Sequence, residues 1–445
     1  MFICALTAFL SITFVAEGQT GETDAIVITL NKAIELGLQN NHQLKISETR
    51  TRIAESRLQQ VKDKALPQAG ASVQYANLVT LSDWNLYFAG GAKPLFSLPM
   101  VYLPAMIGVA SVSKEIFGGF AEKAAKQSSE LLIKASILDE KKDAEDIKLN
   151  IVQSYYNIYK IFRSAQILDE NLSLLDEKER EVNNLLKEGV VTSNEVLKIQ
   201  LEKSNLQLSK VDVKNAKEVA LYNLSLLIGA QEKRAIDIDT NISLDMHDIL
   251  PVEEMINSAL NNRLELEVDA FRKQAVMADF RKLRSIYYPH LDVSGMYVYL
   301  NTSPNTEFIP PRYTFLQAVD IGLSLKYNIS SLYGMKGRIQ EAKLNIKQAD
   351  NATVLQEDQV KSEVFTQYKA YLSSIEKINV SKVALTQATR SYHLSDSKFR
   401  NGLLLSSDLI ISQNLLLQSQ LNVLQAEIDA QLAYHKLQKA SGTKL

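Results

Sequence analysis

The stretch "VDIGLSLKYNI" (residues 319–329) alternates between apolar and polar residues without a break. In an extended backbone, successive side chains point to opposite faces, so this period predicts a strand with one apolar and one polar face. The apolar face would carry Val319, Ile321, Leu323, Leu325, Tyr327 and Ile329, and the polar face Asp320, Gly322, Ser324, Lys326 and Asn328. Long polar helical patterns flank the stretch on both sides, so its pairing partners must come from elsewhere.

Composition excludes several classes of protein. The 445 residues carry a formal charge of −2 with 22% charged residues, which gives no basic field for nucleic acid. Cys4 is the only cysteine, and the five histidines do not stand at metal-ligand spacing. The sequence has no phosphate-binding glycine loop and no nucleophile motif. We therefore expect no enzyme activity, no cofactor and no metal site, and we interpret each histidine as an ordinary surface or boundary residue.

The N-terminus has the composition of a secretory leader. An apolar run of 15 residues, "FICALTAFLSITFVA" (2–16), precedes Ala16-x-Gly18, which offers small residues for cleavage. We expect a signal peptide over residues 1–18. A membrane anchor is the alternative, but 15 residues are short for a span.

The rest of the chain repeats itself. Residues 29–78 align with 251–300 without a gap at an offset of 222, which places Pro67 on Pro289 and Tyr75 on Tyr297. Further on, "LLKEGVVTSNEVLKIQ" (185–200) matches "KFRNGLLLSSDLIISQ" (398–413) at an offset of 213, Gly189 on Gly402. Each copy reads as helix, strand, strand, long helix, tight turn and long helix. We expect repeats over 29–229 and 249–442, joined by a linker over 230–248.

The helices and strands of this unit have unusual lengths. No proline interrupts residues 119–187, which predicts a helix roughly 100 Å long at about 1.5 Å per residue. Apolar residues at 3–4 spacing predict coiled-coil packing of this helix on 193–228. At the first of these turns, Thr192 and Glu195 are expected to form a capping box, with Ser406 or Ser407 capping the later helix. Gly189 and Gly402 are expected to adopt the left-handed geometry of helix C-caps.

Four strands are predicted at about 68–81, 105–117, 290–300 and 318–329. Each is about as long as a tilted strand that crosses a bilayer. Four strands cannot close a barrel alone, so several chains would have to contribute. A soluble sheet packed on helices is the alternative, although the sequence offers no globular core to cover the apolar face.

These features together resemble the outer-membrane efflux protein (TolC-like) family. The residues that carry the resemblance are, in order along the chain, "ITLNKAIELGLQNN" (28–41), "EGVVTSNEVLKIQ" (188–200), "NNRLEL" (261–266) and "RNGLLLSSDLIISQ" (400–413). The resemblance spans 28–442. It implies a mainly α fold, a homotrimer with a shared twelve-stranded transmembrane β-barrel, and long antiparallel coiled-coil helices that form an α-barrel tunnel in the periplasm. It also implies a passive exit duct in the outer membrane, serving efflux or type I secretion. The partners would be a periplasmic adaptor (membrane fusion) protein and an inner-membrane pump of the RND, ABC or MFS type.

The resemblance also assigns residues. The two turns would close the periplasmic aperture and meet the adaptor, through Gly189, Val190, Val191, Thr192, Gly402, Leu403, Leu405 and Ser406. The family's acidic pair after the second turn is Asp408 and Ile411 here, and its turn arginine is Leu404. Three copies of Asp408 would form one negative ring that favours cations, while a helix-start role is the alternative. Apolar packing of Phe399, Leu404 and Ile411 would replace a polar closing network.

In the barrel, the lumen would be lined by Asp292, Ser294, Asp320, Ser324, Lys326 and Asn328. A second class of function stays open at this point: a soluble or surface coiled-coil scaffold without a channel. The scaffold explains the helices but not the strands with a polar face or the matched repeat. A hydrolytic enzyme has little support, since paired carboxylates such as Glu253 and Glu254 have no histidine or serine arranged beside them.

Overall fold

A computed structural model describes residues 26–79, 84–87, 93–98, 102–230, 236–242, 244–302 and 315–443. The expected signal peptide lies outside these ranges. The chain divides into two compact units, and each is presented by itself. No helix in the described ranges is both long and apolar enough to cross a membrane.

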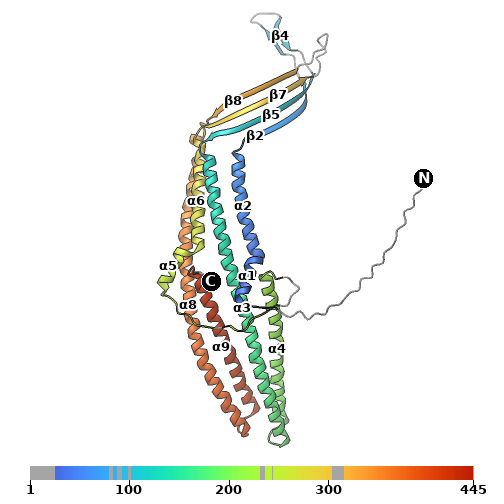
Figure 1. Ribbon diagram of the computed structural model, residues 1–445, viewed down its shortest axis with the longest axis vertical. Coiled ribbons are helices and arrows are strands. Elements are labelled where there is room, and N and C mark those ends of the chain that lie inside the picture. The colour runs from blue at the N-terminus through green and yellow to red at the C-terminus, as the bar shows by residue number, and fades with distance from the viewer. Residues whose placement is uncertain are drawn as a thin grey trace, which may run out of the picture. The chain divides into compact units, whose positions relative to one another are not determined.

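The first unit combines residues 1–41, 150–246 and 374–432. It holds β1 (Ile26–Ile28), α1 (Leu30–Asn40), α4 (Ser193–Leu227) and β6 (Ile236–Ile238), with later parts of α3 (Ala121–Lys187) and α8 (Lys336–Arg400) and most of α9 (Ser406–Ala440) (Figure 1). One apolar cluster fixes the helices to each other, and its most buried members are Leu175, Val182, Ile199, Phe399 and Leu409. Along each helix, neighbouring members of the cluster lie three or seven residues apart, which is the spacing of a coiled-coil seam.

The second unit combines residues 42–149, 247–373 and 433–445. Its helices are α2 (His42–Lys64), α5 (Val252–Asn262), α6 (Leu264–Arg284) and α7 (Ser331–Gly334), with the remaining parts of α3, α8 and α9 and a short 3-10 turn at Ser285–Tyr287. Its strands are β2 (Gln68–Val79), β3 (Trp84–Tyr87), β4 (Pro94–Leu98), β5 (Tyr102–Gly118), β7 (His290–Thr302) and β8 (Phe315–Lys326). The prediction of a mainly α chain with long helices and a few antiparallel strands is confirmed.

The main sheet has the order β2-β5-β7-β8, with all neighbours antiparallel. β2 and β8 are its edges. The register is continuous except for a bulge in β5 between Glu115 and Phe117. β5 is longer than the predicted 105–117, and β8 ends at Lys326, three residues before the alternating sequence pattern ends.

Two small strand pairs have no counterpart in the sequence prediction. β1 and β6 form a parallel pair, and β3 and β4 form a separate hairpin. Strands of three to five residues are too short to produce a recognisable period. The β1–β6 pair also joins segments about 200 residues apart, which local sequence pattern cannot reveal.

In each repeat, a glycine after the last helix packs against an asparagine near the end of the first helix. Gly229 follows α4 at a φ of +63°, and a Cβ there would lie 2.6 Å from Cβ of Asn40. Gly442 follows α9 at +71°, and a Cβ there would lie 2.9 Å from Cβ of Asn262. Asn40 and Asn262 are related by the offset of 222, and the two glycines by 213. Both junctions require glycine, for its positive φ and for the close approach.

A tyrosine hydroxyl holds an extended segment in each unit. In the first unit, Tyr155 Oη lies 3.1 Å from the carbonyl oxygen of Ile28 and 2.9 Å from that of Asp239. In the second, Tyr371 Oη donates to the carbonyl of His247 at 2.7 Å and accepts from the His247 N–H at 3.0 Å. Burial, with the negative charge of Asp239 as a smaller cause, raises the pKa of Tyr155 to about 12.

We predict that Tyr155→Phe lowers the free energy of unfolding by about 1–3 kcal/mol, because the substitution leaves buried carbonyl groups without their donor. Thermal unfolding of the detergent-extracted protein measures the change. Tyr159→Phe is the matched control on the same helix. Tyr159 is also buried, but among the described residues its hydroxyl has no hydrogen-bond partner. Equal melting temperatures for wild type and Tyr155→Phe would contradict this role.

Candidate functional site

The two helix turns of the first unit have the same backbone geometry. Gly189 and Gly402 adopt φ values of +75° and +70°. After α3, the N–H of Val190 donates to the carbonyl of Leu185 at 2.9 Å, and after α8 the N–H of Leu403 donates to Lys398 at 2.9 Å. This is the Schellman pattern, in which a left-handed residue satisfies the last carbonyls of a helix. The expected left-handed geometry of both glycines is confirmed.

The turns present apolar side chains to solvent in the single chain. Val190, Leu403 and Leu405 are 57%, 76% and 60% exposed, and Thr192 is exposed as well. Val191 and Leu404, by contrast, pack against the apolar cluster behind the turns. The turns therefore combine a rigid backbone with an apolar surface.

The expected capping box is wrong. Thr192 is the N-cap residue of α4 by its backbone, but its side chain makes no capping hydrogen bond. Glu195 instead reaches the other turn, where its Oε2 accepts the Ser406 N–H at 2.8 Å, and its Oε1 lies 2.9 Å from Lys198 Nζ. Ser406 is the first residue of α9, so Glu195 satisfies one of the free N–H groups at that helix start. Sequence reasoning missed this because capping boxes are local, whereas this bond spans 211 residues.

The pKa of Glu195 reflects these contacts. Its partial burial raises the pKa, but hydrogen bonds from Lys198 and Ser406 oppose burial and hold the pKa below its ordinary value. A depressed carboxylate pKa stabilises the fold above the unfolded-state pKa, and this stability is lost as the pH falls through the folded-state pKa. The bond between the turns is therefore intact at neutral pH and weakens under acid conditions.

We predict that Glu195→Ala loosens the start of α9. Removing the carboxylate leaves the Ser406 N–H without its acceptor, at a cost of about 1.5–3 kcal/mol for a charged hydrogen bond. Amide hydrogen exchange over residues 406–409 should speed up by roughly tenfold or more. Glu202→Ala is the control, because Glu202 lies two turns further along α4 and its carboxylate accepts a hydrogen bond from Asn205 of the same helix. Unchanged exchange at Ser406 would contradict the link.

A charged network lies behind the turns, between α3 and α8. Lys178 is 3% exposed at its side chain and pairs with Asp396 and, at 2.8 Å, with Glu181. Arg400 adds contacts to Asp396 at 3.1 Å and to Glu181 at 3.5 Å. Burial alone would lower the pKa of Lys178, but its hydrogen bonds to Asp396 and Glu181 raise it, so the ammonium stays charged at neutral pH.

We predict that Lys178→Ala destabilises the fold by about 3 kcal/mol, because the partly buried Asp396 and Glu181 keep only the exposed Arg400 as their counter-charge. Replacement of Lys210, which forms an exposed pair with Asp169, should cost about 0–1 kcal/mol. Thermal unfolding of both variants makes the comparison. Similar losses for the two lysines would rule out the buried network as a stabilising element.

The residues expected at the aperture differ in burial. Phe399 is 2% exposed and packs with Leu409 in the apolar cluster, and Leu404 packs at its margin. Ile411 is 58% exposed and does not join them, so the expected packing of all three side chains is wrong for the single chain. Asp408 lies in the first turn of α9, exposed, on the same side as Ile411 three residues later.

The strands bring most of the predicted lumen residues onto one face. In the β7–β8 register, Asp292 is opposite Ser324, Met296 is opposite Asp320, and Ser294 is next to Gly322. Lys326 Nζ lies 3.4 Å from Asp292 Oδ2 across this face. Asn328 lies beyond the end of β8, where its carbonyl accepts the N–H of Ser331 at 3.1 Å.

Sequence reasoning missed the polar residues that β2 and β5 add to this face. The registers place these residues in line with Ser294 and Asp292: Gln68, Ser72, Gln74, Ser111, Ser113 and Glu115. His290 Nδ1 lies 3.1 Å from Glu115 Oε2. The sequence pattern of β2 and β5 could have predicted these residues, because they alternate with apolar or small ones along each strand.

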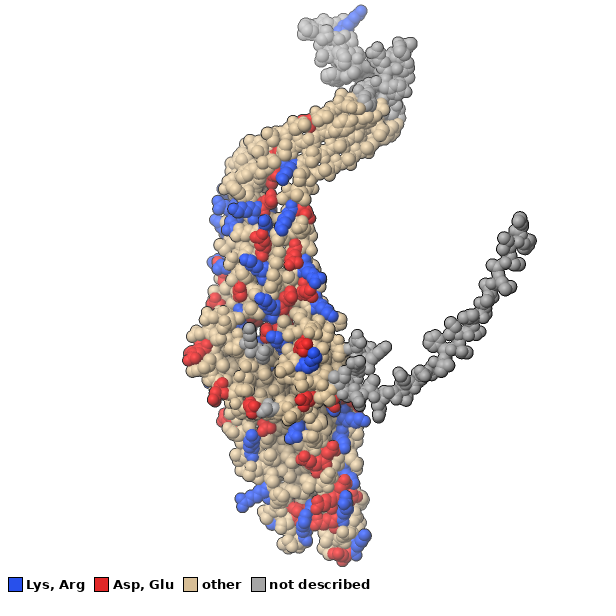
Figure 2. Space-filling model, in the orientation of Figure 1, with Lys and Arg blue, Asp and Glu red and all other residues tan. Residues whose placement is uncertain are grey.

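The opposite face of the sheet is apolar and exposed. Val73, Tyr75, Val319, Ile321 and Leu323 are between 69% and 80% exposed. In Figure 2 the sheet is almost entirely tan, whereas the helices carry many blue and red side chains. A broad exposed apolar surface of this kind marks contact with lipid or with another protein.

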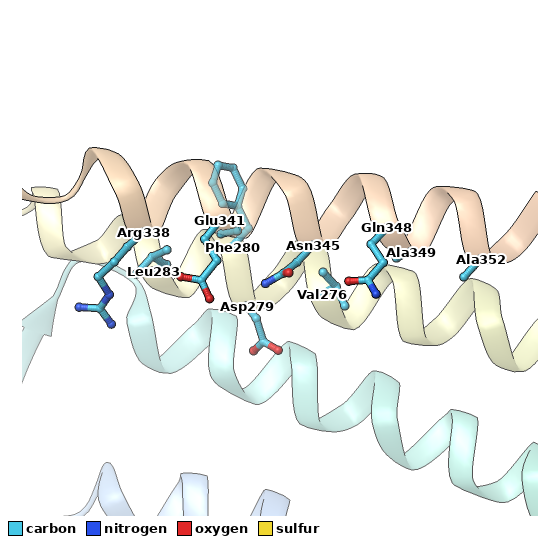
Figure 3. Close-up of a pocket in the computed structure, with 11 residues that line it drawn as sticks. Val276, Asp279, Phe280, Leu283, Arg338, Glu341, Asn345, Gln348, Ala349 and Ala352 are labelled. Atoms are coloured by element: carbon cyan, nitrogen blue, oxygen red, sulfur yellow. The ribbon is translucent and has the colours of Figure 1, made fainter.

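A groove of about 620 Å³ lies between α6 and α8 in the second unit. Asp279 comes from α6, and Arg338, Glu341 and Asn345 come from α8 (Figure 3). Its lining has no histidine, serine or cysteine that could act as a nucleophile or base beside these carboxylates. Within the described ranges, no group of three or more His, Cys, Asp or Glu side chains could hold a metal ion.

One family model and several solved structures are similar to this chain. Residues 255–443 match the family model described as outer membrane efflux protein. Among solved structures, the outer-membrane channel OprN has a TM-score of 0.75 at 17% identity, over 93% of this chain and 90% of its own. The outer membrane protein VceC from Vibrio cholerae has 0.73 at 15%, over 93% and 96%.

The outer membrane channel CmeC from Campylobacter jejuni has a TM-score of 0.72 at 16% identity, over 99% of this chain and 93% of its own. At these identities the likeness concerns the fold. No curated protein sequence matches the chain.

Proposed function

We propose that the chain is a member of the outer membrane efflux protein family, whose model matches residues 255–443, and that three copies form one exit duct. The duct crosses the outer membrane through a shared β-barrel and extends into the periplasm through the long helices. Substrate reaches it from an inner-membrane pump and a periplasmic adaptor, and the duct conducts that substrate passively.

One observation carries this proposal: the four-stranded sheet has an apolar face, a polar face and two unpaired edges. An open edge cannot lie in lipid, because each unpaired backbone N–H or C=O there costs several kcal/mol. β2 and β8 run in opposite directions, so β8 of one copy can pair with β2 of the next in an antiparallel ladder. Repeating this contact around a ring removes every edge.

The repeats are proposed as the functional halves of each copy. Residues 29–229 and 249–442 would each supply one hairpin and one helical pair, with 230–248 as the connecting segment. The polar face of the sheet, with Asp292, Ser294, Asp320, Ser324 and Lys326, would line the lumen. Asn328, beyond the end of β8, would lie at the periplasmic rim.

The two turns are proposed as the end of the duct that meets the adaptor. Their apolar residues Val190, Leu403 and Leu405 are exposed, and Gly189 and Gly402 fix the backbone that presents them. Val191, Thr192 and Ser406 complete the turn segments. Exposed apolar side chains on a rigid turn are suited to contact with a second protein.

We predict that Asp408→Asn lowers the cation preference of the channel. A ring of three carboxylates raises the local cation concentration, and its removal should reduce the cation-to-anion permeability ratio by about twofold or more. Reversal potentials in planar bilayers under a KCl gradient measure this ratio, with Asp212→Asn on α4 as the charge-matched control. An unchanged ratio would assign Asp408 to the helix start alone.

The proposal as a whole has a direct test. Protein extracted in detergent should migrate as a trimer and should produce discrete conductance steps in planar bilayers. A monomer that stays in solution without detergent and carries no current would support the scaffold reading instead.

A further inference from the structure

The internal repeat continues into the register of the strands. Gln74 is paired with Ile107 in the first hairpin, and its repeat counterpart Met296 is paired with Asp320 in the second. β2 therefore corresponds to β7 at the offset of 222, and β5 corresponds to β8 at 213. The offset of 213 is the one that relates the two helix turns, Gly189 and Gly402, so the correspondence holds from the strands to the turns.

The chain contains one example of how two repeats join. β5 of the first repeat pairs with β7 of the second, with Ser111 opposite Met296 and Val112 opposite Gly295. We call this β5–β7 contact the inner seam. β8 is the second long strand of the second repeat, as β5 is of the first. β2 of a further copy would be the first long strand of the next repeat, as β7 is of the second.

We propose that β8 pairs with β2 of the next copy in the register of the inner seam, which places Ser324 opposite Gln74 and Leu325 opposite Val73. These residues are the repeat counterparts of Ser111 with Met296 and of Val112 with Gly295. This inference rests on the proposed function, since it requires that copies of the chain close a barrel. The partner is a second copy of this chain, joined edge to edge.

The faces of the sheet agree with this register. Residues directly opposite each other lie on one face, and a shift by a single residue would turn apolar side chains toward the polar face. Leu325 and Val73 both belong to the apolar face, with exposed fractions of 71% and 70%. Ser324 and Gln74 both belong to the polar face.

The register also accounts for the early end of β8. In the inner seam, β5 continues past its last partner on β2, and Lys114 pairs with Val293 of β7. The counterpart of Lys114 is Tyr327, which would face Ala71 of the next copy. In the single chain, Tyr327 and Ile329 are 45% and 66% exposed and β8 ends at Lys326. We infer that the alternating residues 327–329 complete the strand when a second copy supplies their partner.

A competing register would align the strand ends, with Lys326 opposite Gln68 and Asp320 opposite Gln74. It preserves the two faces as well, since it differs from the proposed register by an even number of residues. However, it would make the seam between copies differ from the inner seam, and it would leave residues 327–329 beyond the end of β2.

Cysteine cross-linking distinguishes the registers. In full-length protein with Cys4→Ser, the pairs Gln74→Cys with Ser324→Cys, Val73→Cys with Leu325→Cys, and Ala71→Cys with Tyr327→Cys would bridge neighbouring copies. Opposed Cα atoms are about 4.5 or 5.5 Å apart in alternating pairs, and both distances suit a disulfide. Within one chain, β2 and β8 are three strand spacings apart, about 14 Å, so no internal bond can form.

Three further pairs serve as controls. Ser111→Cys with Met296→Cys should form a disulfide within one chain, because the structure pairs these positions. Gln74→Cys with Asp320→Cys tests the aligned-ends register, and Gln74→Cys with Gly322→Cys tests the register between the two. Non-reducing gels of membrane-embedded protein then report covalent trimers.

We expect covalent trimers from all three proposed pairs and roughly tenfold less from the two off-register pairs, whose sulfur atoms lie too far apart. Preferential trimers from Gln74→Cys with Asp320→Cys or with Gly322→Cys would overturn the register while leaving the trimeric channel intact. Cross-linking at 74 and 324 without cross-linking at 71 and 327 would overturn the extension of β8. If the protein formed no trimer in any variant, including wild type, the proposed function itself would fail.

Discussion

The backbone hydrogen-bonding groups at the edges of the sheet constrain the rest of this protein. β2 and β8 each leave a row of N–H and C=O groups unpaired in the single chain. One face of the same sheet is apolar and exposed, which suits lipid, and lipid cannot satisfy those groups. In the proposed duct, copies of the chain satisfy these groups, and the inner seam of one chain is the example for the contact that would join them.

The long helices of both repeats turn back at a glycine and pack against each other through apolar seams. Each long helix ends in a left-handed glycine and returns along its neighbour, so apolar seams run between helices instead of forming a globular core. The bond from Glu195 to Ser406 and the buried network around Lys178 then hold the two turns of one copy to each other. Lys178 lies between the cluster residues Leu175 and Val182, and Glu195 lies next to the cluster residue Val196. The polar contacts therefore lie beside the apolar cluster, behind the turns whose exposed residues are proposed to meet the adaptor.

The two halves differ at the residue that joins their first two helices. The first repeat joins α1 and α2 through Asn41, whose side chain donates to the carbonyl of Leu227 at 2.7 Å. At the matching place, Arg263 donates to the carbonyl of Ala440 at 3.2 Å and also pairs with Glu265 and Glu363. The second junction is thus held by charges as well as by hydrogen bonds, while the backbone geometry is shared.

The sequence by itself determined the elements that depend on local period. The alternation in 68–79 and 319–326 predicted strands, the proline-free heptad-like stretches predicted long helices, and Gly189 and Gly402 predicted left-handed turns, because side-chain period and glycine conformations are local properties. Only the tertiary structure decided which distant residues meet. Glu195 caps the other turn instead of its own helix, Glu115 and His290 join the polar face, and Ile411 stays apart from Phe399. These outcomes depend on strand register and helix rotation, which are set by packing between segments as much as 200 residues apart.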